Sequence, residues 1–226
     1  MNRCAGLVAA VGLYISTPVV VHAQYGSREL PRAGTVEVGA TATWMTGRSL
    51  GKVTATETSN PGVTSNPLGL FVADPSVKPS VGIEGQVGVY LSPAVELEGT
   101  ASFTRPVVSV HLSDDFEGAA DTIAEKTVTQ YLIGGSALYH FGRGRLKPFV
   151  FGGGAYLRQL EADAAAVQNG TELHAGGGLK YWFGKGRRRS GLRLDARVSA
   201  RNRSAGFDPM QRATMAVVSA GFALLF

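Results

Sequence analysis

Eight segments of the chain, each about 10 to 15 residues long, alternate apolar and polar residues, and this pattern constrains the fold more than any other feature. The clearest is 192–201, LRLDARVSAR, in which Leu, Ala or Val at every second position alternates with charged residues and Ser. A strand of this kind needs an apolar medium on one face and a polar medium on the other. Each segment can also cross a hydrocarbon layer as a tilted strand of about 9 to 11 residues. The segments are 35–45, 81–91, 95–104, 127–141, 148–158, 172–183, 192–201 and 212–226.

Composition excludes several other classes of protein. The 226 residues include 30 Gly and a single Cys; 17% are charged and 44% are hydrophobic. Charged residues are too few for a disordered chain or a coiled coil, and one cysteine cannot build a disulfide framework. The net charge of +5 would favour nucleic acid as the partner of a cytosolic protein. No nucleic-acid partner is expected here, because the first residues indicate export.

The N-terminus has the layout of a secretory signal peptide. Arg3 precedes the apolar run 5–15, Pro18 ends that run, and 21–23 (VHA) offers a cleavage site before Gln24. An uncleaved membrane helix is the alternative, but the run is shorter than the roughly 20 apolar residues that a spanning helix needs. We therefore expect three parts: a cleaved signal peptide, 1–23; a short periplasmic segment, 24–33; and a barrel domain, 34–226.

The connections between the eight segments alternate strictly in length. Those after the first, third, fifth and seventh segments are long, and those after the second, fourth and sixth are short. A soluble β-sandwich has no reason to sort its loops in this way, whereas a membrane barrel does. The sequence therefore predicts an all-β protein, a transmembrane antiparallel up-and-down β-barrel of eight strands, with both termini periplasmic and the long loops extracellular. A ten-stranded barrel stays open if the first loop, 47–78, hides a hairpin, although its residues do not alternate well.

The two faces of the segment 148–158 differ less clearly than those of most other segments. In 148–158 we assign Phe149, Phe151 and Leu157 to the outer face and Tyr156 and Arg158 to the inner face. Glycine triplets interrupt the segments 148–158 and 172–183, where they indicate sharp curvature or close packing.

Aromatic residues on the outward faces predict two membrane-interface girdles. These are Trp44, Phe103 and Tyr131 at the outer end, and Tyr139, Phe141, Phe149, Tyr181, Phe183 and Phe226 at the periplasmic end.

The last strand carries a terminal motif. Ser219, Gly221, Leu224 and Phe226 resemble the C-terminal targeting signal of bacterial outer-membrane barrels. The resemblance implies that the barrel-assembly machinery is a partner. With its strands, loops and terminus, the chain resembles the small barrel group of OmpA domains, OmpX and opacity proteins. The peptidoglycan-binding activity of OmpA proteins is not expected, since the sequence ends at the barrel.

Charged residues are expected to fill the interior, because eight strands leave only enough room for side chains. Enclosed charges persist only if they are paired, so we predict a salt-bridge network that plugs the barrel. The alternative is a narrow, porin-like channel lined by the same residues. The predicted inward charges are Glu37, Glu84, Glu96, Glu98, Glu172 and Asp195, with Arg158, Lys180, Arg193, Arg197 and Arg201.

The long loops are the expected binding surface, because function concentrates in loops held by rigid scaffolds. The first loop includes an apolar patch, 68–73, and suggests adhesion or binding of an unknown surface ligand, besides a role in envelope integrity. Outer-membrane lipids are further expected partners: the basic cluster 185–189 for inner-leaflet head groups, and Arg201, Arg203 and Arg212 for lipopolysaccharide phosphates.

An enzyme is not expected. The segment 111–113, His-Leu-Ser, resembles the catalytic pair of lipid A deacylases, but Asp114 stands where that family has Asn. A lipid-modifying enzyme is therefore the least favoured alternative. No cofactor or metal is expected either, since no group of His, Cys or carboxylates has the spacing of metal ligands.

Overall fold

The computed structural model describes residues 31–56, 69–142, 144–161, 167–183, 189–203 and 213–226. The signal peptide and most of the predicted periplasmic segment lie outside these residues. The described residues contain no helix long and apolar enough to cross a membrane. The strands are β1 (Val36–Met45), β2 (Arg48–Ser49), β3 (Val53–Thr56), β4 (Gly69–Val77), β5 (Ser80–Tyr90), β6 (Val95–Thr104), β7 (Val107–Ser113), β8 (Thr122–His140), β9 (Leu146–Glu161), β10 (Val167–Trp182), β11 (Arg189–Arg203) and β12 (Ala213–Leu225).

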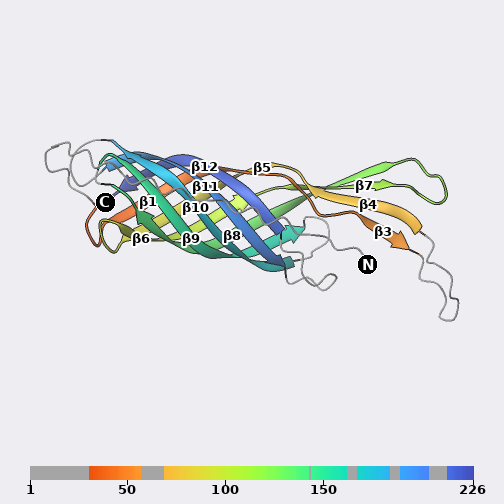
Figure 1. The fold of residues 1–226 in the computed structure, drawn as a ribbon, viewed down its shortest axis with the longest axis horizontal. Helices are drawn as coiled ribbons and strands as arrows, with labels where there is room; N and C mark the ends of the chain where they lie inside the picture. Colours follow the sequence, from red (N-terminus) through yellow and green to blue (C-terminus); the bar gives the residue numbers. More distant parts are fainter. Residues whose placement is uncertain (1–30, 57–68, 143, 162–166, 184–188, 204–212) are drawn as a thin grey trace, which may run out of the picture.

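Eight of these strands close into a barrel. Their hydrogen-bonded order is β8-β6-β5-β1-β12-β11-β10-β9, and the pairing of β9 with β8 closes the ring. Every neighbouring pair is antiparallel. The prediction of an eight-stranded antiparallel barrel is confirmed. We call the end where β1 begins and β12 ends the terminal end (Figure 1).

The opposite end of the barrel continues into a small sheet, which we call the extension. It consists of β2, β3, β4, β7 and the first residues of β8, 122–127, and it projects well beyond the barrel (Figure 1). The expectation that 47–78 is a loop is wrong for its described residues. The ten-stranded alternative is wrong as well, because these strands join the extension and not the ring. Neither face of β4 is consistently buried, so no alternation marks it in the sequence.

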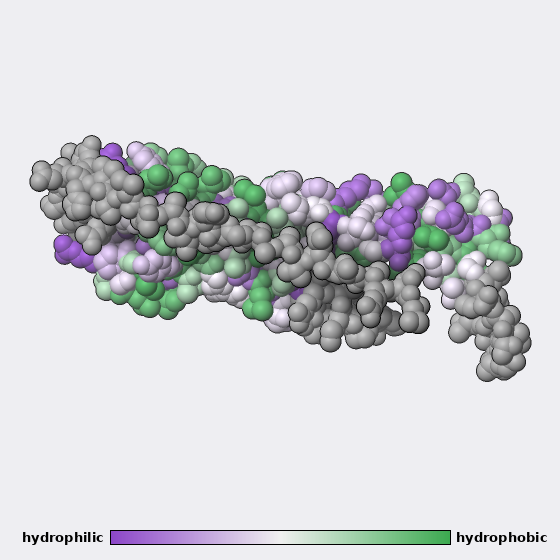
Figure 2. All heavy atoms as spheres, viewed as in Figure 1, coloured by the Kyte–Doolittle hydropathy of each residue, from purple (hydrophilic) through white to green (hydrophobic). Residues whose placement is uncertain are grey.

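Side chains on the barrel wall are arranged inversely to those of a soluble protein. On β5, Val81 and Ile83 are 69% and 65% exposed, whereas Glu84 and Gln86 on the other face are 3% and 4% exposed. Apolar side chains cover much of the outer wall of the barrel, and the extension is more mixed (Figure 2). Such a wall is stable only in an apolar surrounding, as the alternation predicts.

The predicted faces of β9 are wrong. Phe149, Phe151 and Leu157 point into the barrel and are nearly fully buried, whereas Tyr156 and Arg158 are exposed on the outer face. Both faces of this strand carry apolar residues, so its alternation has too little contrast to fix the phase. The pairing with β8 fixes it instead, because it places Leu157 opposite the inward Leu132.

Glycines on β10 make room for the inward rings of β9. Gly176 is paired with Phe151, and Gly178 with Phe149. A Cβ atom at Gly176 would lie 2.8 Å from Cζ of Phe151, and one at Gly178 would lie 2.7 Å from Cζ of Phe149. Both contacts are too close for any larger residue, so the second glycine triplet serves close packing.

Candidate functional site

The interior at the terminal end is organised around Lys180. Its Nζ lies 2.7 Å from Oε1 of Glu37 and 2.9 Å from Oε2 of Glu96, which come from β1 and β6. Nε2 of His140 lies 2.7 Å from the same Oε2 of Glu96, and the Tyr90 hydroxyl donates to Glu37 at 3.0 Å. All five side chains are buried. They tie together β1, β5, β6, β8 and β10.

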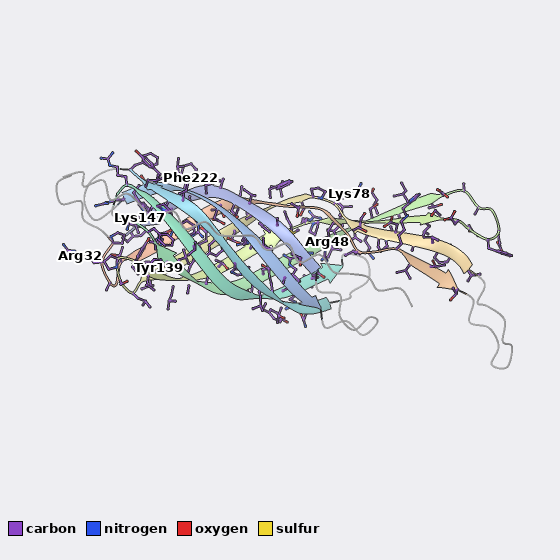
Figure 3. The ribbon with its side chains drawn as sticks, in the orientation of Figure 1. Arg32, Arg48, Lys78, Tyr139, Lys147 and Phe222 are labelled. Carbon is purple, nitrogen blue, oxygen red and sulfur yellow. The ribbon has the colours of Figure 1, made fainter. Side chains whose placement is uncertain are left out.

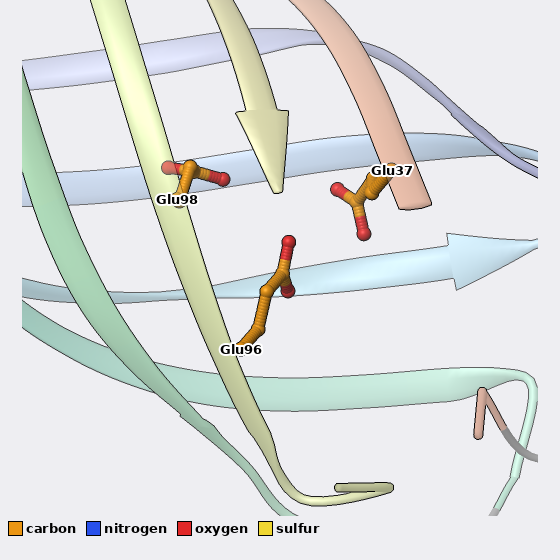
Figure 4. A group of neighbouring side chains, drawn as sticks. All are labelled: Glu37, Glu96 and Glu98. Carbon is orange, nitrogen blue, oxygen red and sulfur yellow. The ribbon is translucent and has the colours of Figure 1, made fainter. Parts of the chain in front are cut away.

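Three carboxylates converge in this region. Oxygens of Glu37, Glu96 and Glu98 lie within 4.8 Å of one another, and Figure 4 shows them gathered inside the barrel. Carboxylate oxygens in such a group could hold a divalent cation. Here the chain supplies the cations itself, since Lys180 contacts Glu37 and Glu96 and Arg193 contacts Glu98. The group is therefore part of an internal salt-bridge layer.

The pair of Arg193 and Glu98 crosses the full width of the barrel. Both terminal nitrogens of Arg193 donate to the carboxylate of Glu98, and its Nε donates to Asp195 at 2.9 Å. Arg193 lies on β11 and Glu98 on β6, which are separated by three strands in either direction around the ring. A side-chain contact between opposite strands must pass through the axis of the barrel. This pair therefore occupies the centre of the lumen.

Two more ion pairs follow along β11 toward the extension. Arg197 binds Glu84 on β5 through two hydrogen bonds of 2.6 and 3.1 Å. Arg201 donates to Glu172 at 2.6 Å and to the side-chain oxygen of Gln130 at 3.1 Å. The three arginines of β11 are spaced four residues apart on its inward face. They form a ladder that places ion pairs at three levels of the interior.

The comparisons with known proteins agree with this geometry. No protein-family model and no curated protein matches the sequence. The structure of neisserial surface protein A is similar over 85% of this chain and 99% of that protein, with 14% identity and a TM-score of 0.55. OprG, an outer membrane protein of Pseudomonas aeruginosa, is similar over 88% and 99%, with 12% identity and a TM-score of 0.56.

The chain has the fold of the small eight-stranded outer-membrane barrels. The fold suggested by its strands, loops and terminal motif is thus confirmed. Its extension is built on strands that in sequence look like loops.

The interior of the barrel holds one charged residue that was not predicted, and it lacks one that was predicted. Lys147 on β9 is only 2% exposed and faces inward, whereas Arg158 on the same strand faces outward. Both differences follow from the reversed phase of β9. The described interior still holds six acidic residues and five Lys or Arg. A charged residue one position before the predicted segment was the available signal, because Lys147 shares its face with Phe149.

Lys147 also differs from the other interior cations in its contacts. Its Nζ has no hydrogen-bond partner among the described residues and lies 5.9 Å from the centre of the Tyr90 ring. Figure 3 places it at the terminal end of the barrel. The other four cations each contact at least one carboxylate.

Most of the aromatic residues predicted for the girdles lie on the outer face of the barrel wall, and their place at a membrane interface stays a prediction. At the terminal end, Tyr139 contacts Phe141 and Tyr181 contacts Phe183, each pair with ring centres 5.0 Å apart. Toward the extension, Phe103 and Tyr131 have ring centres 5.3 Å apart. Phe149 is wrong as a girdle residue, because it lies inside. The exposed members also include Trp44 and Phe226, and Tyr156 was missed.

The terminal motif lies on β12. Ser219 is buried and faces inward, whereas Leu224 and Phe226 are exposed on the outer wall, in phase with Phe222. Gly221 pairs with Thr41 of β1 and with Arg193 of β11. Recognition of this motif by the assembly machinery stays a prediction.

The remaining predicted residues lie elsewhere. Arg201 is buried inside the barrel and so cannot meet a lipid phosphate. Two of the predicted lipid contacts, Arg212 and 185–188, lie outside the described residues, as does the side chain of Arg203. His111 lies on β7 of the extension, where its Nε2 is 3.4 Å from Asp121.

Proposed function

We propose that this protein is an outer-membrane barrel that is sealed by its internal ion pairs, contributes to envelope integrity and binds a surface partner through its extension. The bond between Arg193 and Glu98 carries the first part of the proposal. It joins opposite strands, so solute cannot pass at this level unless the bond breaks. Ion pairs on both sides of it, at Lys180 and at Arg197, join strands with only two others between them, so they narrow the lumen without crossing its axis.

Because the interior is sealed, we expect the barrel to conduct no ionic current across a bilayer. The mature chain, 24–226, refolded into a planar bilayer, should give no reproducible single-channel steps. The double variant Glu98→Ala/Arg193→Ala should conduct, because it removes the bond across the axis. Lys78→Met is the matched control, since Lys78 pairs with Glu125 at the base of the extension, outside the lumen (Figure 3). Steps in the wild-type protein that change when Arg197 is replaced would instead show a narrow channel.

The orientation in the membrane is part of the same proposal. The terminal end has the short turns, such as Ser92–Pro93 between β5 and β6, and the opposite end has the extension. Outer-membrane barrels keep short turns in the periplasm and long connections outside the cell. The extension is then displayed at the cell surface.

The extension is suited to binding because it exposes large apolar side chains outside the barrel. Val53, Phe116 and Ile123 are 58%, 65% and 63% exposed. Exposed apolar residues beyond a membrane-spanning wall mark a candidate protein-binding surface. Its strands are paired to one another and rise from the rigid barrel, so the surface is preorganised.

Removing the extension should abolish binding and leave the barrel folded. The register pairs Arg48 with Val77, and Val107 with Thr127, so 49–76 and 108–126 can each be replaced by an Asn-Gly turn. Bacteria displaying the full protein should adhere to immobilised fibronectin or laminin, and bacteria displaying the shortened protein should not. Heat-modifiable migration on a gel checks that the barrel is folded. Equal adhesion of both strains would contradict this role.

A further inference from the structure

The outer wall of the barrel has an apolar groove across β12, β1, β5, β6 and β8. Its volume is about 720 Å³. Small residues form most of its floor. Large side chains line it at Phe222 on one side, at Ile83 between the two sides, and at Phe103, Tyr131 and Ile133 on the other side. The floor residues that face outward are Ala40, Ala42, Gly85, Ala101 and Ala220.

The groove runs obliquely from the middle of the wall toward the extension. Cross-strand neighbours link Phe222 to Ala40, Gly85, Ala101 and Ile133 in a single row. At one end of this row, Phe222 is four residues from the end of the chain at Phe226. At the other, Ile133 is seven residues from His140, where β8 reaches the terminal end. The row therefore lies farther from the terminal end at β8 than at β12. An acyl chain that enters the membrane from the extension side could follow this slope.

Two arginines lie at the end of the groove that is nearer the extension, beside Phe103 and Tyr131; we call it the upper end. Arg158 on β9 is the direct cross-strand neighbour of Tyr131, and Arg105 follows Phe103 by two residues on the same face. Both side chains are exposed. Neither forms an ion pair with another described residue, in contrast to Lys180, Arg193, Arg197 and Arg201 inside the barrel. These two cations are thus available to an external anion.

The height of Arg158 matches the membrane interface. It follows Leu146, the first residue of β9, by 12 residues. At about 3.3 Å per residue on a strand tilted by about 40°, it lies about 30 Å from the terminal end, just above an apolar band about 25 Å tall. A guanidinium at this depth can reach phosphate groups of the lipid head-group layer and bind them through paired hydrogen bonds.

We propose that this wall binds one phosphorylated, acylated glycolipid of the lipid A class, with phosphate on Arg105 and Arg158 and an acyl chain in the groove. The choice of an outer-leaflet lipid rests on the orientation proposed above, which places the extension outside the cell. The small floor residues give the chain its room, and the absence of polar side chains on the floor favours a hydrocarbon occupant. The aromatic rings of Phe103 and Tyr131 separate the chain from the charged upper end.

The test is a lipid titration of the full mature protein in detergent micelles, with bound lipid counted by native mass spectrometry. Wild-type protein should bind lipid A at least tenfold more tightly than dephosphorylated lipid A or phosphatidylglycerol. Arg105→Gln/Arg158→Gln should weaken lipid A binding at least tenfold. Gly85→Leu should do the same by filling the groove, since a Cβ atom at Gly85 meets no atom within 4 Å. Arg32→Gln/Arg145→Gln, an equal charge change near the terminal end, should bind as the wild type does.

Three results would overturn the proposal. They are no lipid A bound to the wild type, unchanged affinity in Arg105→Gln/Arg158→Gln, and equal affinity for phosphatidylglycerol, which would make the wall a general anionic-lipid surface. The conductance and adhesion experiments use separate readouts. Failure of this site is therefore distinguishable from failure of the sealed barrel or of the binding extension.

Discussion

Replacing Arg193 with Met should lower the free energy of unfolding by about 3–5 kcal/mol, because it leaves carboxylates buried without their cation. Arg193 and Glu98 are 3% and 5% exposed, and Arg193 also contacts Asp195. Water cannot readily solvate the orphaned charge of Glu98 at the axis. Urea titration of the barrel in lipid vesicles, followed by tryptophan fluorescence, measures the loss.

The double variant Glu98→Met/Arg193→Met gives the decisive comparison. Replacing a buried ion pair with apolar side chains of similar volume is often neutral or stabilising. We therefore expect the double variant to be more stable than Arg193→Met, with part of the loss remaining because Asp195 stays buried without its cation. Arg145, which is half-buried and immediately precedes β9, provides the control, and Arg145→Met should cost no more than about 0.5 kcal/mol. Single and double losses that simply add would show that the two side chains do not interact.

Strand number and most strand phases follow from the sequence because the two faces of a membrane strand see different media. On β11, from Leu192 to Arg201, every inward residue is polar and every outward residue is apolar, so a one-residue shift would invert the whole pattern. β9 lacks that contrast, since Phe149 and Phe151 on one face compete with Val150 and Tyr156 on the other. Its phase depends on β8 and β10 and cannot be derived from β9 alone.

The partners of the interior charges depend on geometry that no single segment encodes. Glu98 and Arg193 are separated by 95 residues, and they meet because the ring closes with β6 opposite β11. Closure and stagger are properties of all eight strands together. The same holds for the groove, whose floor is assembled from alanines and glycines that look unremarkable in each segment. The extension escaped prediction for a different reason, because its strands have no buried face to generate alternation.

Lys180 and Lys147 permit a test of whether contacts or burial alone decide the stability of an interior charge. They are direct cross-strand neighbours on β10 and β9, and both are nearly fully buried. Lys180→Met should destabilise the barrel by about 3–5 kcal/mol, since it leaves Glu37 and Glu96 close together without their shared cation. The same urea titration measures the loss.

Lys147→Met should change the free energy of unfolding by no more than about 1 kcal/mol, or raise it, because no described carboxylate loses a partner and the cost of burying an unpaired ammonium disappears. The two variants make the same chemical change at adjacent positions, so packing differences largely cancel. Equal losses would mean that Lys147 holds the network through its charge at longer range. A large loss for Lys180 alone would show that the terminal end is stabilised by one cation shared between two strands, β1 and β6, that are not neighbours in the ring.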